Sequence, residues 1–118
     1  MQTLEKRTAD SLKFDIDCSS LLSTGETITS VTSTNATPVT SPPLVFGSPL
    51  INVAPQTYTD AYGSTLTAAI GKVVQVNISG GLIAPGAQVQ EYIIRALLVT
   101  SLNPAVEATV RLRLNDTP

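Results

Sequence analysis

The sequence predicts an all-β domain that folds as an antiparallel sandwich of about seven strands. Apolar residues occupy 42% of the 118 positions and charged residues only 14%, and a chain rich in Val, Ile, Leu and Thr favours strands. Several short segments alternate between apolar and polar residues, and turns that contain Gly or Pro separate them. Short strands at such intervals, with no clear helical pattern among them, are typical of a β-sandwich.

The N-terminal residues 1–11 are polar and are expected to form an arm, with a short helical turn at residues 4–8. A single sandwich domain is expected at residues 12–118. Its first strand is predicted at residues 12–17, where apolar and charged residues alternate strictly. A second strand is predicted at residues 26–33, after a turn that contains glycine.

The middle of the chain is predicted to be mostly loop. Four prolines within residues 34–49 argue against a long strand there. A short strand is expected at residues 50–53, and residues 56–64 are expected to form a loop. Residues 66–70 fit either a strand or one helical turn, and the sequence pattern does not separate the two.

Alternation is strongest in the C-terminal half of the chain. Strands are predicted at residues 73–78, 88–101 and 106–114, with turns between them at Gly-Gly, Pro-Gly and Asn-Pro pairs. A spacing of two places each set of apolar residues on one face of its strand. The residues predicted to share such faces are Val74, Val76, Ile78, Ala108, Val110, Leu112 and Leu114.

Two regions of the chain carry a resemblance to a known family: LKFDIDCSSLLSTGETITSV near the N-terminus, and VVQVNISGG, APGAQVQEYIIRALLVTS and ATVRLRL in the C-terminal half. They resemble short phage proteins and phage structural domains of the immunoglobulin-like type. The resemblance implies an immunoglobulin-like sandwich in a virion protein, which would serve as capsid decoration or cement, neck, tail-tube appendage or fibre. The chain departs from the family at Ile16 or a neighbour, where tryptophan is usual, and this bears on core packing more than on topology.

The composition excludes the common catalytic arrangements. No histidine is present, so the commonest general base at neutral pH is missing and no Ser-His-Asp or Cys-His arrangement is possible. Cys18 is the single cysteine, which excludes an intrachain disulfide and a cysteine-ligated zinc site, and we predict that it is a small buried residue. The sequence therefore predicts a protein that is not an enzyme, with no catalytic residues, no metal and no cofactor.

Two clusters leave a binding alternative open. Asp15 and Asp17 have a spacing that suits oxygen ligation of calcium, although a solvated or interface-facing strand edge is favoured because the glycine and distal glutamate of an EF-hand loop are missing. Tyr58, Asp60 and Tyr62 would suit a sugar-binding loop. A structural role is favoured there because no third aromatic residue or arginine lies nearby.

Charge and hydropathy exclude two kinds of partner. The net charge is −2 and the pI is about 4.8, and seven basic residues spread along the chain form no basic stripe, so we expect no nucleic-acid partner. The longest apolar run, residues 96–99, is far too short to span a bilayer, and we expect no membrane partner. Without a secretory signal pattern, the chain is expected to be made in the host cytoplasm and retained in the particle that it joins.

The strand predicted at residues 88–101 is apolar on both faces towards its C-terminal end. One face must meet the core, and the resemblance places Tyr92, Ile94 and Leu98 there. Leaving the opposite apolar side chains in water forgoes about 1.5–3 kcal/mol each, so we predict an interface with another subunit or with the capsid. The alternative is that the middle of the chain folds over this face. The predicted interface residues, including two arginines of the last strand, are Ile93, Arg95, Leu97, Val99, Arg111 and Arg113.

Together these patterns and the resemblance predict a non-enzymatic structural protein of a phage virion. We expect a homo-oligomer, with a trimer favoured, that binds the major capsid protein on the outer capsid surface as a decoration or cement protein and stabilises the shell by mass action. One alternative is a neck or tail component, such as a connector or fibre-anchoring domain. A second alternative is a carbohydrate-binding adhesion module, against which the scarcity of aromatic residues argues.

Overall fold

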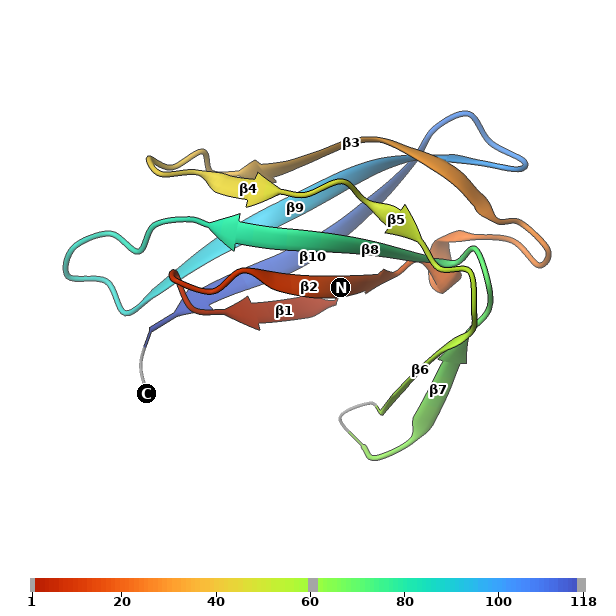
Figure 1. Cartoon of the computed structure of the whole chain (residues 1–118), viewed down its shortest axis with the longest axis horizontal. Coiled ribbons are helices and arrows are strands. Elements are labelled where there is room, and N and C mark those ends of the chain that lie inside the picture. Colours follow the sequence, from red (N-terminus) through yellow and green to blue (C-terminus); the bar gives the residue numbers. More distant parts are fainter. Residues whose placement is uncertain (1, 60–61, 117–118) are drawn as a thin grey trace.

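The computed structural model describes residues 2–59 and 62–116, which fold as two β-sheets packed face to face (Figure 1). None of these residues belongs to a helix long and apolar enough to cross a membrane. The prediction of an all-β sandwich is confirmed. The elements of the described residues are β1 (Thr3–Lys6), β2 (Leu12–Asp17), the short 3₁₀ helix η1 (Ser19–Leu21), β3 (Ile28–Thr37), β4 (Leu44–Phe46), β5 (Leu50–Ile51), β6 (Gln56–Thr59), β7 (Thr65–Ala68), β8 (Val73–Gly80), β9 (Val89–Thr100) and β10 (Val106–Asn115).

The two sheets are mostly antiparallel. The first has the strand order β1-β10-β9-β3, and the second has β2-β8-β4, with β5 also paired to β8. The pairs are antiparallel except for β1 and β10, which run parallel. Strands β6 and β7 form a separate hairpin that projects from the sandwich (Figure 1). The sequence pattern did not predict β1, β4 or β6, which is why the described residues contain ten strands and not about seven.

The core lies between the sheets and is built from alternate residues of the long strands. β9 and β10 pair in continuous register from Val106 opposite Leu98 to Asn115 opposite Val89, so their inward side chains lie next to each other. The predicted core faces of β8, β9 and β10 are confirmed. The fully buried core includes Ile16, Val74, Val76, Ile78, Tyr92, Ile94, Ala96, Leu98, Leu112 and Leu114.

Tyr92 is the largest fully buried side chain, in a chain that has no tryptophan. Its hydroxyl accepts a hydrogen bond from the Leu82 backbone N–H at 3.0 Å and shares another with the Thr40 hydroxyl at 2.7 Å. Gly81 lies beside it with φ +96°, where a Cβ atom would come within 2.6 Å of Leu114 Cδ1. The ring therefore fills the core, while its polar end fixes two loops at one end of the sandwich.

The N-terminal residues correct one expectation. Residues 4–8 were predicted to include a helical turn, but Thr3–Lys6 form β1, which pairs with β10. Exposed and buried residues alternate along β1, so Leu4 and Lys6 face inward. The Lys6 Nζ donates hydrogen bonds to the backbone carbonyls of Arg7 at 2.7 Å and Asp10 at 3.0 Å, and burial lowers the pKa of this amine. The strand is short and half polar, which is why the local sequence resembles a helical turn.

The middle of the chain corrects a second expectation. Residues 56–64 were predicted to be a loop, but Gln56–Thr59 form β6, and the ambiguous stretch that follows is the strand β7, Thr65–Ala68. Asn52 closes the base of this hairpin. Its Oδ1 accepts from the backbone N–H groups of Lys72 and Val73, and its Nδ2 donates to the carbonyls of Ala54 and Ala69, at 2.9 to 3.1 Å.

A buried carboxylate joins two turns at one end of the sandwich. Glu26 accepts hydrogen bonds from the Ser23 backbone N–H at 2.9 Å, from the Asn103 Nδ2 at 2.8 Å and from the Thr100 hydroxyl. These bonds, that from Thr100 above all, hold the pKa of Glu26 below its ordinary value. The cluster ties the segment before β3 to the turn between β9 and β10.

We predict that Leu98→Ala lowers the free energy of unfolding by about 3 kcal/mol, because Leu98 is fully buried between the sheets and its truncation leaves a cavity. Chemical denaturation followed by far-UV circular dichroism measures this change. Leu102→Ala is the matched control, since Leu102 is 65% exposed and its truncation should change the stability by less than about 0.5 kcal/mol. Equal effects of the two changes would contradict the position of the core.

We also predict that Glu26 makes the protein less stable in acid. A carboxyl group whose pKa is depressed by folding stabilises the native state fully above its unfolded pKa, and this contribution is lost as the pH falls through the folded pKa. The unfolding free energy should therefore fall as the pH drops below the ordinary glutamate value of 4.5. Denaturation at a series of pH values should show a flatter acid limb for Glu26→Gln; an unchanged acid limb would exclude this role of Glu26.

Candidate interaction surface

All six predicted interface residues lie on one face of the first sheet. They occupy the positions of β9 and β10 that point away from the core, since their neighbours along each strand are the buried ones. The antiparallel register sets Arg111 opposite Ile93 and Leu97 opposite Glu107. We call this surface the outer face and define it by Glu91, Ile93, Arg95, Leu97, Val99, Glu107, Thr109, Arg111 and Arg113.

An apolar stripe runs along β9 on the outer face. Leu97 is 36% exposed, its neighbour Val99 is half-buried, and Ile93, which lies beyond Arg95 on the same face, is also half-buried. Strands β4 and β5 do not cover the stripe, because they pair with β8 in the other sheet. Among the described residues, this part of the middle of the chain therefore does not bury the outer face, and Leu97 on it stays 36% exposed.

The three arginines of the outer face have acidic neighbours in the same sheet. The Arg95 Nε lies 3.5 Å from a carboxylate oxygen of Glu107, and Glu91 lies 3.7 Å from the Nε of Arg111 and 3.8 Å from that of Arg113. Sequence reasoning missed both glutamates. The alternation of the sequence places both glutamates at outward positions of their strands. Which arginines they face could be predicted only from the register of the two strands.

Asp17 and the single cysteine contribute to the fold. Asp17 Oδ1 accepts hydrogen bonds from the Ser19 backbone N–H at 2.9 Å and from its hydroxyl at 2.6 Å, which supports η1. Within residues 2–59 and 62–116, no three Cys, Asp or Glu side chains are grouped to hold a metal ion. Cys18 is fully buried as predicted, and burial raises the pKa of its thiol to about 12, so the thiol is protonated at neutral pH.

The proposed sugar-binding loop lies partly outside the described residues. Asp60 lies outside the described residues. Tyr62 is 94% exposed at the β6–β7 end of the molecule. The sugar-binding alternative therefore stays a prediction.

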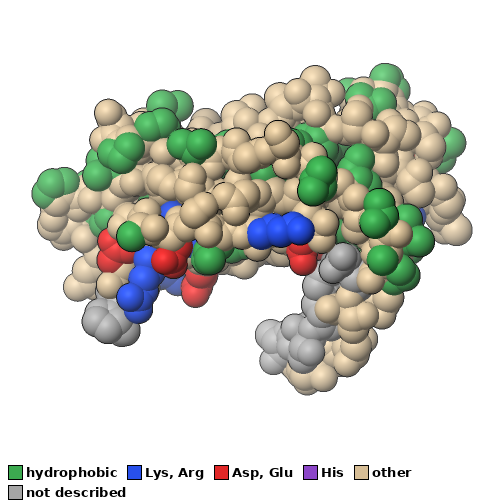
Figure 2. All heavy atoms as spheres, viewed as in Figure 1, with side chains coloured by type: hydrophobic (Ala, Val, Ile, Leu, Met, Phe, Trp, Pro, Cys, Tyr) green, Lys and Arg blue, Asp and Glu red, His purple; other side chains and the backbone are tan. Residues whose placement is uncertain are grey.

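Charged residues are distributed unevenly over the molecule. Seven of the sixteen charged residues lie between positions 5 and 17, and none lies between positions 27 and 59. Strands β3, β4 and β5 fall within that uncharged segment. Figure 2 shows the consequence for one face of the molecule: acidic and basic side chains gather along its β1–β2 side, whereas none is seen along its β3–β4–β5 side.

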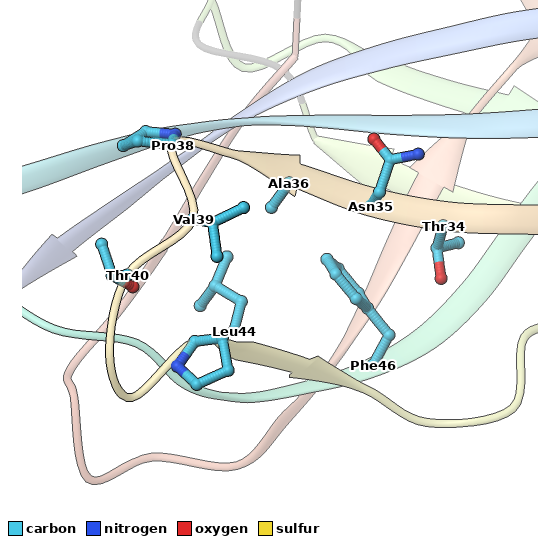
Figure 3. A pocket seen from close by; sticks show the side chains of 9 residues that line it. Thr34, Asn35, Ala36, Pro38, Val39, Thr40, Leu44 and Phe46 are labelled. Atoms are coloured by element: carbon cyan, nitrogen blue, oxygen red, sulfur yellow. The ribbon is translucent and has the colours of Figure 1, made fainter.

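A groove separates the two sheets on this uncharged side, between the edge strands β3 and β4. It has a volume of about 260 Å³, and its apolar lining comes from Ala36, Val39, Leu44 and Phe46 (Figure 3). The Thr34 side chain of β3 also points towards the groove (Figure 3). Sequence analysis did not predict this groove, because it depends on two strands that are not paired with each other.

Comparison with family models, with curated proteins and with solved structures finds no match to this chain.

We predict that Glu91→Gln lowers the unfolding free energy by less than about 1 kcal/mol, because the ion pairs that Glu91 makes are exposed to water. Raising the salt concentration to about 1 M should remove the difference, since salt screens exposed charges. Denaturation at low and high salt measures both effects. A larger loss that persists in salt would show that the outer-face charges stabilise the monomer itself.

Proposed function

We propose that this protein is a non-enzymatic structural component of a phage particle, and that it binds the outer capsid surface as a homo-oligomeric decoration or cement protein. The observation that carries the proposal is the apolar stripe of Ile93, Leu97 and Val99, which lies on the outer face between exposed ion pairs. An apolar centre surrounded by arginines and other polar groups is the usual composition of a protein interface.

The mechanism follows from the energetics of burial. Covering the stripe removes apolar surface from water, which is favourable by roughly 25 cal/mol per Å². The ion pairs around it contribute little to the monomer, so the arginines are free to exchange their glutamates for acidic groups of a partner. Many copies that bind only assembled capsid subunits would shift the equilibrium towards the assembled shell.

The resemblance of the N-terminal and C-terminal segments to phage immunoglobulin-like domains supports the same proposal. The low content of charged residues supports it further, because a protein with little charge on its surface favours the assembled state. The resemblance fits a neck or tail component as well, and location in the particle separates the two.

The first experiment is to measure the copy number of this chain per purified particle by quantitative mass spectrometry, with the major capsid protein as the internal reference. Capsid decoration requires a copy number close to the number of capsid subunits. A number of about six to a few dozen, as a ring or fibre attachment would give, would reject decoration in favour of the neck or tail.

For the outer face, we predict that Leu97→Asp weakens binding to undecorated particles by about tenfold or more, because a charge replaces the centre of the apolar stripe. Co-sedimentation of the purified variant with particles measures the affinity. Leu102→Asp is the matched control, since Leu102 is exposed in the β9–β10 turn and outside the stripe. Equal binding by the two variants would exclude the outer face as the capsid contact.

A further inference from the structure

Strand β3 is an edge strand that lacks most of the features that usually protect such an edge. It pairs with β9 on one side only, and its ten residues contain no charge and no proline. Natural edge strands are commonly protected by charged side chains, by prolines or by bulges, which discourage pairing with another chain. The opposite edge of the same sheet, β1, carries Glu5 and Lys6.

The protection that β3 does have is confined to its first half. Register shifts against β9 occur between Ile28 and Ser30 and between Val31 and Ser33, and such bulges bend a strand. From Thr34 to Thr37 the pairing with β9 is regular. This second half therefore presents a regular, uncharged edge to solvent.

The apolar groove lies directly beside this regular half. Residues 34–36 of β3 form one wall, and Leu44 and Phe46 of β4 form the opposite wall (Figure 3). Val39, at the groove, is 84% exposed. A further strand added to β3 would cover the open side of the groove and bury part of this apolar surface.

We propose that β3 pairs edge to edge with β3 of a second copy of this chain, antiparallel and about a two-fold axis near Asn35. The chemistry of the edge favours a second copy: the strand ITSVTSTNAT is rich in Thr and Ser, which pair well across antiparallel strands. Positions 27–59 contain no charged residue, so pairing β3 with its own copy would place no like charges from this segment next to each other. The contact would join the two four-stranded sheets into one continuous sheet.

This contact deepens the proposed function, because it gives one form of the homo-oligomer proposed there. It uses an edge of the first sheet and not its outer face, so the outer-face change Leu97→Asp should leave it intact. Loss of capsid binding in Leu97→Asp and loss of the dimer in Asn35→Glu therefore test the capsid contact and the edge contact separately.

The test is sedimentation velocity of the purified full chain over a range of concentrations, with Asn35→Glu as the disrupting variant. Asn35 is exposed and lies opposite Arg95 in the β3–β9 register, so a glutamate there has a favourable neighbour in the monomer. In the two-fold dimer the same change brings two carboxylates together. We expect the dimer dissociation constant to rise by about 30-fold or more.

Thr3→Glu is the matched control. Thr3 is also exposed on an edge strand of the same sheet, and it lies opposite Arg111 in the β1–β10 register. A dimer that is weakened by Asn35→Glu but not by Thr3→Glu supports the proposal. Two results would overturn the proposal. One is a chain that is monomeric at about 100 μM, far above the dissociation constants of specific dimers. The other is a dimer that both changes leave intact. Either result would leave the β3 edge available to a strand from a different protein.

A cysteine variant tests the axis directly. In oxidising buffer, Asn35→Cys should form a disulfide-linked dimer, because the two Asn35 positions face each other across the proposed axis, whereas Thr3→Cys should not. The native Cys18 is fully buried and does not compete. Equal crosslinking of the two variants would show that collisions, and not a two-fold contact, form the bond.

Discussion

The long antiparallel pair of β9 and β10 is the contact on which the rest of the sandwich depends. Each strand has one face in the core, and each carries a further strand on its other edge: β3 lies beside β9, and β1 lies beside β10. The second sheet then packs β8 against their buried side chains. Because this pairing fixes which residues point inward, it also fixes which residues form the outer face. The register of β9 and β10 thus determines both the core and the candidate interaction surface.

The strands that the sequence predicts well are those whose own side chains alternate. β2, β8, β9 and β10 each show a period of two, which reports a strand with one buried face without reference to any partner. Core residues such as Val76 and Leu112 could be predicted for the same reason. The predicted outward positions on β9 follow from the same alternation.

The features that sequence reasoning missed depend on contacts between distant residues. β1 is only four residues long and is stabilised by a parallel partner more than 100 positions away, Leu4 opposite Leu112. The ion pairs of Glu91 and Glu107 require the register of two strands, and the groove requires the relative position of two unpaired edges. Strand β6 was missed because Gln56–Thr59 is a polar segment with a single aromatic residue. Strand β7 is only four residues long, so its alternation is too short to separate a strand from a helical turn.

The closure of hairpin β6–β7 by Asn52 has a consequence for how this scaffold can change. All four hydrogen bonds of the Asn52 side chain are made at the base of the hairpin, to residues that flank β6 and β7 rather than to the strands themselves. Strands β6 and β7 are thus joined to the sandwich at this base and project away from it (Figure 1). Foreign peptides grafted between β6 and β7 would be displayed away from the body of the protein, at a site where lengthening of the chain costs little folding free energy.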